Sequence, residues 1–163
     1  MIVRDETQAD IAAIREVVDA AFPGPAEARL VDLLRADGGL TYSLVAVEAG
    51  RLVGHVAFSP MTAPFRALGL GPIAVTPDRQ RTGIGRRLIE AGLARATRDG
   101  WQAVFLLGDP RFYERFGFSV ERAAGYTTPY AGPHWMVVAL GGEPLPTPTG
   151  EVAYAPAFAR LDG

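Results

Sequence analysis

The spacing of apolar residues changes along the chain, and each spacing predicts a different element. Between Ile11 and Phe22, apolar side chains recur at helical spacing, which indicates an amphipathic helix. Thr7 and Asp10 stand where a capping box would begin that helix. A second helix is expected to start at Pro25, which suits a first helical turn, and to end at the glycine pair that follows its last apolar residues.

Strand-forming runs come next. Tyr42–Glu48 and Leu52–Phe58 are rich in valine, leucine and alanine, and the Ala49-Gly50 turn between them predicts a hairpin. Ala67–Val75 is expected to form a third strand. Because glycine and proline interrupt this run, we expect a bulge there or the close approach of a ligand to its backbone.

The second half of the chain predicts a long helix and a buried strand. The helix would run from Gly83 to Arg98, and the unbroken apolar run Ala103–Leu107 is typical of a strand covered on both faces. The remaining expected elements are a short helix at Pro110–Phe116, strands at Phe118–Glu121 and Trp135–Leu140, and a short strand within Glu151–Phe158. This order predicts an α/β fold of the α+β type. It would have one mixed sheet with helices on both faces, and not a regular βαβ repeat.

The length of 163 residues fits one domain, with a core at 1–140 and a proline-rich C-terminal extension at 141–163. Hydrophobic residues make up 48% of the chain and the net charge is −2, which excludes a disordered or collagen-like protein. The N-terminus lacks the features of a signal peptide, and no apolar run is long enough to span a membrane. We therefore expect a cytoplasmic protein without a membrane partner.

Missing residue types remove several kinds of chemistry. The chain has no cysteine, which excludes disulfides, thiolate metal sites and cysteine nucleophiles. All 16 basic residues are arginines, so a P-loop lysine and a lysine Schiff base are excluded as well. With only two histidines in the chain, we expect no metal site.

The segment between the third strand and the long helix has the features of an anion site. The first amides of a helix have no partner within it and carry partial positive charge. Gly83 and Gly85 leave this backbone accessible, and four arginines lie within nine residues of the turn. Together these features predict a site for a di- or polyphosphate. A dinucleotide fingerprint is disfavoured because Leu88 occupies its third glycine position.

Two motifs resemble those of the GNAT N-acetyltransferase superfamily. Gln80-x-x-Gly83-x-Gly85 is similar to the superfamily's acyl-CoA motif, and Tyr113-x-x-x-Gly117-Phe118 is similar to its later Tyr-x-x-x-Gly-Phe motif. The element order up to about residue 140 also matches. The resemblance implies the GNAT fold, with a mostly antiparallel sheet, and acetyl-CoA as cosubstrate. Leu107–Pro110 and the tail Tyr154–Phe158 further resemble a group of small bacterial predicted N-acetyltransferases.

The resemblance also implies which residues bind the cosubstrate. Amides from Arg81 to Arg86 would bind the CoA pyrophosphate, and backbone groups of Ile73 to Val75 would pair with the pantetheine arm like an added strand. The amide of Val75 would lie near the thioester carbonyl. The implied cofactor-binding residues are Ile73, Ala74, Val75, Gln80, Arg81, Thr82, Gly83, Ile84, Gly85 and Arg86.

Acetyl transfer needs an amine held against the thioester, a donor to the developing oxyanion and a proton for the leaving thiolate. A phenol with a pKa of about 10 can protonate a thiolate whose thiol has a pKa of about 8.5. Tyr113 matches the superfamily's tyrosine and is therefore the expected general acid. Many members carry asparagine where this chain has Asp109, and we expect Asp109 to cap the helix that follows it.

The general base stays open among Glu48, His55, His134 and a water chain. The acceptor groove is expected between the first two helices, the loop 60–66 and the segment 125–134. The acceptor itself would be a primary amine of a small molecule or peptide, which the sequence does not identify.

Two functions from different classes are compatible with these residues. The first is an N-acetyltransferase that works by direct attack of a bound amine, and the second is a non-catalytic acyl-CoA-binding or interaction module that keeps the fold. The presence of Tyr113 favours the enzyme. The arginine cluster is local and the whole chain is slightly acidic. Both features favour CoA over nucleic acid as the ligand of these arginines. A homodimer through the last strands and the tail is compatible with the sequence, and only analogy favours it.

Overall fold

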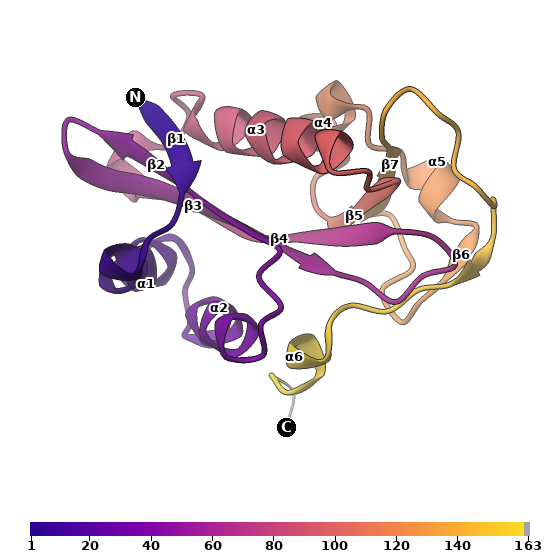
Figure 1. Cartoon of the computed structure of the whole chain (residues 1–163), viewed down its shortest axis with the longest axis horizontal. Coiled ribbons are helices and arrows are strands. Elements are labelled where there is room, and N and C mark those ends of the chain that lie inside the picture. The colour runs from indigo at the N-terminus through magenta and orange to yellow at the C-terminus, as the bar shows by residue number, and fades with distance from the viewer. Residues whose placement is uncertain (162–163) are drawn as a thin grey trace.

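A six-stranded mixed sheet forms the centre of the molecule in the computed structural model, which describes residues 1–161 (Figure 1). The strands are β1 (Ile2–Asp5), β2 (Tyr42–Glu48), β3 (Arg51–Pro60), β4 (Ala67–Val75), β5 (Ala103–Leu107), β6 (Tyr126–Thr127), β7 (Trp135–Ala139) and β8 (Gly150–Glu151). In the large sheet they lie in the order β1-β2-β3-β4-β5-β7, while β6 and β8 form a small parallel pair. Every neighbouring pair in the large sheet is antiparallel except β4 and β5.

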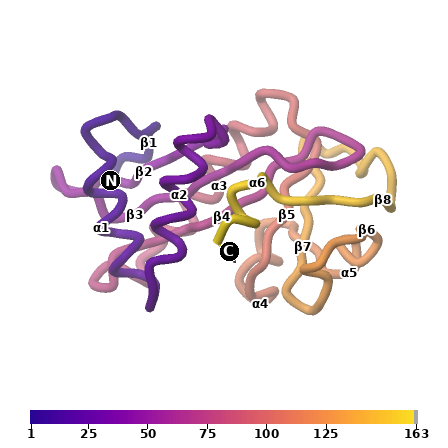
Figure 2. The backbone as a smooth tube through the Cα atoms, turned by 90° about the horizontal axis from the view of Figure 1, so that it is seen from below, coloured from indigo at the N-terminus to yellow at the C-terminus, as the bar shows by residue number. Residues whose placement is uncertain are grey.

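Helices cover both faces of this sheet, as the order of elements predicts. The helices are α1 (Ile11–Ala21), α2 (Ala26–Ala36), α3 (Ile84–Arg98), α4 (Pro110–Tyr113), α5 (Val120–Ala123) and α6 (Pro156–Ala159). Figure 1 shows α1 and α2 on one face and α3 on the other. Seen from below in Figure 2, α6 near the C-terminus lies beside α2.

Each face of the sheet has its own core. On the α3 face, Phe58, Leu88 and Val104 are fully buried. On the opposite face, Ile14 of α1 packs with Val45 of β2. β2 and β3 are therefore buried in unbroken runs rather than at alternate residues, because helices cover both of their faces.

The start of the chain folds as its polar pattern predicts. The Thr7 amide donates to the Asp10 carboxylate at 2.7 Å, which forms the expected capping box before α1. The hairpin of β2 and β3 and the bounds of β4 and β5 are also confirmed.

The expected irregularity inside β4 is a bulge. Val56 of β3 pairs with Ile73, but Phe58, two residues later, pairs with Leu70, three residues away. One extra residue therefore lies on β4 at the Gly71-Pro72 step. Gly71 has a φ of 149°, which favours glycine.

One strand was not predicted, and two expectations were wrong. β1 was missed because it has only four residues, is largely exposed and alternates poorly. Phe118–Glu121 is not a strand: Ser119 makes one bridge to β7, and its hydroxyl then accepts a hydrogen bond from the Arg122 amide at 3.1 Å and so begins α5. In the tail, the strand ends at Glu151, and Pro156 begins α6 at a position that suits proline.

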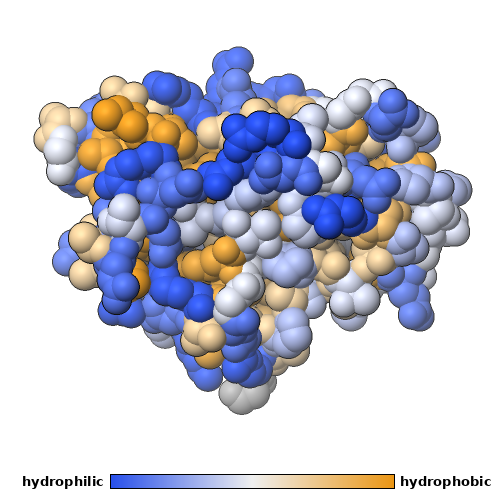
Figure 3. Space-filling view, viewed as in Figure 1, coloured by the Kyte–Doolittle hydropathy of each residue, from blue (hydrophilic) through white to orange (hydrophobic). Residues whose placement is uncertain are grey.

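Among residues 1–161, no helix is both long enough and apolar enough to cross a bilayer. Figure 3 shows hydrophilic residues over much of one face, with apolar residues in separate patches. The same described part of the chain holds no cluster of three or more His, Asp or Glu side chains arranged to bind a metal ion.

Candidate active site

The site begins where β4 and β5 stop pairing. These two parallel strands share only three residue pairs, from Ala67 with Ala103 to Gly69 with Phe105. Beyond Gly69, β4 continues to Val75 with β3 on one side and no strand on the other. The bulged half of β4 therefore presents free backbone groups along an open edge.

Ile73 and Val75 face this open edge. The Thr76 amide donates to the Val53 carbonyl of β3 at 2.9 Å, and backbone groups of successive strand residues alternate in direction. Ala74 therefore points its backbone groups toward β3, and its two neighbours point theirs away. The Val75 carbonyl accepts a hydrogen bond from the Gln80 side-chain amide at 3.1 Å, which leaves the Val75 amide as the accessible group.

A cavity of about 350 Å³ lies against this edge. The β4 side contributes the bulged segment from Leu70 to Ile73, and the β5 side contributes Leu107 and Tyr113. The remaining walls come from α1 and α2 and from two later segments of the chain. These lining residues are Phe22, Glu27, Leu30, Tyr130, Tyr154 and Phe158.

The loop before α3 supplies free amides. The first hydrogen bond within this helix runs from the Arg87 amide to the Gly83 carbonyl at 3.1 Å, so the amides of Ile84, Gly85 and Arg86 have no partner inside the helix. Gly83 has a φ of 89°, a left-handed conformation that needs glycine. The Thr82 hydroxyl donates to the Arg79 carbonyl at 2.6 Å and so fixes the turn. This arrangement can bind an anionic group at the N-terminus of a 15-residue helix.

The arginines of this loop are not equivalent. Arg79 pairs with Glu48 at 2.7 Å, and Arg86 pairs with Glu90 at 2.8 Å. The exposed side chain of Arg81 makes no ion pair with any residue among 1–161. The sequence suggested a single cluster of four cations, but two of these are already neutralised by carboxylates.

Tyr113 is held in place by its own short helix. The Asp109 side chain accepts a hydrogen bond from the Arg111 amide at 2.9 Å, which confirms its expected role as helix cap. The Tyr113 ring packs against the backbone of Gly108, where a Cβ atom would lie 2.3 Å from the ring. Edge-on contacts with Phe112 and Phe118, at ring-centre distances of 5.0 and 5.9 Å, restrict its remaining freedom.

Tyr113 lines the cavity, and its phenol is in a state suited to proton donation. Burial raises the pKa of Tyr113, so the phenol stays protonated at neutral pH. No side chain or backbone group in the described part of the chain hydrogen-bonds with this hydroxyl, whereas Tyr42 and Tyr126 both donate to protein acceptors. Its proton is therefore available to a ligand in the cavity.

Two of the expected bases lie outside the cavity lining. Glu48 pairs with Arg79, and the hydrogen bond from this arginine lowers the pKa of Glu48. His134 is exposed, and its Nδ1 lies 3.1 Å from the Gly108 carbonyl. Because a carbonyl only accepts, Nδ1 is the donor of this hydrogen bond.

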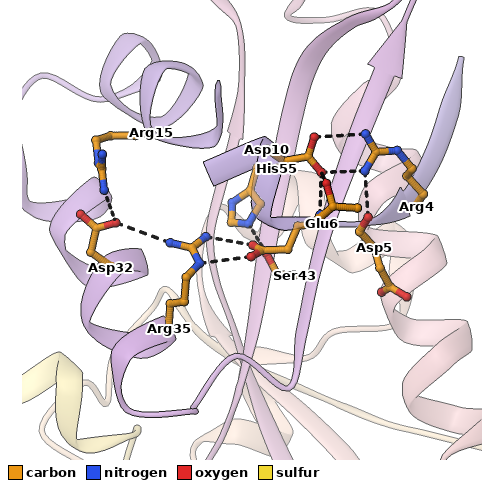
Figure 4. Close-up of polar contacts among 10 residues, drawn as sticks. Arg4, Asp5, Glu6, Asp10, Arg15, Asp32, Arg35, Ser43 and His55 are labelled. Carbon is orange, nitrogen blue, oxygen red and sulfur yellow. Dashed lines mark hydrogen bonds and ion pairs between the residues drawn. The ribbon is translucent and has the colours of Figure 1, made fainter. Parts of the chain in front are cut away.

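His55 does not face the acceptor groove. It is fully buried beneath α1, and its Nε2 lies 2.7 Å from the Ser43 hydroxyl (Figure 4). Ser43 donates to the Glu6 carboxylate, which Arg35 also binds at 2.9 and 3.1 Å. Burial lowers the pKa of His55 to about 4, against a smaller opposing effect of the Glu6 charge. The ring is therefore neutral and inaccessible to a substrate.

The acceptor side of the cavity differs from the expected groove in one wall. The first two helices and the segment 125–134 contribute Phe22, Glu27 and Tyr130. The loop 60–66 does not line the cavity. Instead, Thr62 exchanges two backbone hydrogen bonds of 2.9 Å with Ala153, and so holds the tail that does line it. Neither Glu27 nor the tail was identified from the sequence, because no motif marks a residue that reaches a site only through tertiary packing.

Comparisons with known proteins agree with this geometry. A sequence model of the Acetyltransferase (GNAT) family matches residues 11–118. The uncharacterised N-acetyltransferase YhbS of Escherichia coli is 36% identical over 99% of this chain and 100% of its own length. The crystal structure of E. coli YhbS in complex with CoA superposes with a TM-score of 0.90, at 34% identity over 98% of this chain and 92% of that one. A GNAT family acetyltransferase from Brucella melitensis in complex with acetyl-CoA has a TM-score of 0.81, at 39% identity over 96% and 97% of the two chains.

Proposed function

This chain belongs to the GNAT acetyltransferase family, and we propose that it transfers the acetyl group of acetyl-CoA to the primary amine of a small molecule or peptide. It is an acetyl-CoA-dependent N-acetyltransferase, since its relatives are N-acetyltransferases and two similar structures hold CoA and acetyl-CoA. The acceptor class and the roles of individual residues are our proposals.

The proposed cosubstrate site has two parts. The free amides of Ile84, Gly85 and Arg86, within the motif from Gln80 to Arg86, would bind the CoA pyrophosphate at the positive end of α3. The open edge of β4 would pair with the pantetheine arm through Ile73 and Val75. Ala74 would contribute by holding the strand to β3 between them.

The proposed reaction is a direct attack. The neutral amine nitrogen attacks the thioester carbonyl carbon, a C–N bond forms, and the negative charge on the carbonyl oxygen is stabilised by the Val75 amide. When the C–S bond breaks, the CoA thiolate takes the proton of the Tyr113 hydroxyl. The nitrogen releases its extra proton to a base, and the phenolate of Tyr113 regains a proton from solvent. Positioning by the cavity contributes to the rate because both reactants bind in the same cavity.

The position of Tyr113 supports this proposal most strongly. Its hydroxyl has no acceptor among residues 1–161, it lies at a cavity bounded by the open edge of β4, and burial raises the pKa of its phenol. Aromatic packing explains Phe112 and Phe118 but does not explain a free hydroxyl at the cavity.

Replacing Tyr113 with phenylalanine tests the role directly. The ring contacts would be kept and the proton lost, so we expect kcat to fall by about 10²-fold or more while acetyl-CoA affinity stays nearly unchanged. The rate of CoA thiol release would be followed with a thiol-reactive dye, using an amine mixture of 2-phenylethylamine, spermidine, kanamycin and a short peptide. Because the chain has no cysteine, protein thiols add no background.

Tyr42→Phe is the matched control, because the Tyr42 hydroxyl binds Asp99 away from the cavity. We expect this variant to keep the wild-type kcat. An unchanged kcat in Tyr113→Phe would remove Tyr113 from the mechanism, and absence of acetylation with every amine in wild-type protein would contradict the proposed small-amine or peptide acceptor.

A further inference from the structure

The acceptor side of the cavity is lined by an aromatic cluster that the tail completes. Tyr154 and Phe158 stack at a ring-centre distance of 4.4 Å, and Tyr130 meets Tyr154 edge-on at 5.2 Å. Phe22, which directly follows α1, and Leu30 of α2 extend this surface. The cavity wall opposite the reacting groups is therefore mainly apolar and aromatic.

The backbone of β4 is shaped to receive this cluster. A Cβ atom at Gly69 would lie 2.8 Å from the Tyr154 ring, so only glycine allows the ring to rest there. Gly69 is also the last residue of β4 that pairs with β5. Tyr154 thus packs at the point where the two strands separate, next to the place where an acetyl group would enter. Burial raises the pKa of Tyr154, so its ring stays uncharged.

Glu27 is the one charged residue among those that line this cavity in the described part of the chain. It is partly buried at the start of α2, and it takes part in no ion pair or side-chain hydrogen bond among residues 1–161. Asp32, on the same helix, is by contrast paired with Arg15 at 3.0 Å and with Arg35 at 3.5 Å. A carboxylate without a cation of its own in an apolar cavity is suited to bind a cationic ligand group.

We propose that the acceptor is a small primary amine carried on an aromatic or similarly bulky apolar group, and that Glu27 binds its ammonium group. This inference rests on the proposed acetyltransfer. The apolar group lies against Tyr130, Tyr154 and Phe158, while the ammonium group pairs with Glu27 between that surface and the thioester. Glu27 takes one proton from the ammonium nitrogen and releases it to solvent, and the neutral amine then attacks as described above.

The charge and size of the cavity disfavour other amines. A polyamine or an aminoglycoside carries several cations, and the lining offers a single carboxylate for them. A volume of about 350 Å³ is at the low end for ligand pockets, and the acetylated end of pantetheine occupies part of it. The remaining space suits one compact apolar group and not a peptide chain.

The first experiment compares acceptors in wild-type protein by CoA thiol release. 2-Phenylethylamine is the probe, and ethylamine, spermidine, kanamycin and a short peptide with a free N-terminus are the comparisons. We expect kcat/KM for 2-phenylethylamine to exceed that of each comparison by about tenfold or more, as expected for burial of an aromatic ring in an apolar pocket. Equal or lower kcat/KM than any one comparison would overturn the inference.

Two variants test the residues. Glu27→Gln keeps the shape and removes the charge, and we expect it to raise KM for 2-phenylethylamine by about tenfold or more, with KM for acetyl-CoA unchanged. Tyr130→Ala removes an exposed part of the aromatic surface without disturbing the core, and it should lower the preference for 2-phenylethylamine over ethylamine. Glu16→Gln is the matched control, because Glu16 is exposed on α1 and does not line the cavity.

Failure of this inference can be told from failure of the proposed function. If acetyl-CoA binds and another amine is acetylated fastest, or if Glu27→Gln behaves like Glu16→Gln, the acceptor assignment is wrong and the acetyltransfer stands. If neither acetyl-CoA binding nor acetylation of any amine is detected, both fail together.

Discussion

Protonation of buried His55 should destabilise the fold in mild acid. Burial lowers the pKa of His55 from its ordinary value of 6.5 to about 4, with the Glu6 charge acting in the opposite direction and Arg35 adding to the shift. Above pH 6.5 the histidine is neutral in both the folded and the unfolded chain, so it has no effect on the pH dependence. Below pH 6.5 the unfolded chain takes up a proton that the folded chain refuses, and stability falls.

The size of this effect follows from the two pKa values. Each unit of pKa difference corresponds to about 1.4 kcal/mol, so the full loss below pH 4 would be about 3 kcal/mol. At pH 5 the loss would have reached about 2 kcal/mol relative to pH 7.5. Burial alone would raise the pKa of Glu6, but hydrogen bonds from Arg35 and Ser43 outweigh burial and lower it, so Glu6 titrates below this window.

Urea unfolding at pH 7.5, 6, 5.5 and 5 would measure the loss. We expect the free energy of unfolding of wild-type protein to fall by about 2 kcal/mol over this range and that of His55→Gln to fall much less. His134→Gln is the control, because His134 is exposed and is the other histidine of the chain. A wild-type stability that stays constant down to pH 5, or a loss that persists in His55→Gln, would show that protonation of His55 does not control stability in mild acid.

Two glycine substitutions, with a third as their control, test the packing around the core and the site. A Cβ at Gly92 would lie 2.2 Å from the Phe58 ring, so Gly92→Ala should destabilise the protein by about 1–2 kcal/mol despite the higher helix propensity of alanine, as measured by urea unfolding. Gly24→Ala, where the new Cβ has no neighbour within 4 Å, should leave stability nearly unchanged. Gly108→Ala would push the Tyr113 ring from its place, and kcat should fall at least tenfold while acetyl-CoA affinity is kept, which would place the effect in the chemical step. An unaltered kcat would mean that the ring position does not limit the reaction.

Much of the fold could be predicted because several elements carry strong local patterns. The strand Ala67–Val75 and its bulge follow from an apolar run interrupted by glycine and proline, and the bounds of α3 follow from helical spacing and a glycine stop. β1 could not be predicted, because a short edge strand has too weak a local pattern. It is recognised as a strand only through its pairing with β2. The strand expected at Phe118–Glu121 was wrong for a local reason. Phe118 is buried in the core, but the hydroxyl of the next residue, Ser119, caps α5 and so ends the extended segment.

The two halves of the candidate site also differ in how far the sequence alone identifies them. The cosubstrate half is built from contiguous segments around Gly83 and Tyr113, so sequence motifs identify it. The acceptor half joins Glu27, Tyr130 and Tyr154 from three distant segments. No spacing rule relates such residues, and only the folded chain shows that they share a cavity.

Acetyl-CoA binding is the most direct test of the proposed cosubstrate site. Purified protein would be titrated with acetyl-CoA in a calorimeter, with NADH and ATP as phosphate-bearing controls that lack the pantetheine arm. We predict selective micromolar binding of acetyl-CoA, because free amides at α3 and the open edge of β4 would together recognise both pyrophosphate and pantetheine. Absence of binding, or a preference for NADH or ATP, would contradict it and would mean that the loop from Gln80 to Arg86 serves another ligand.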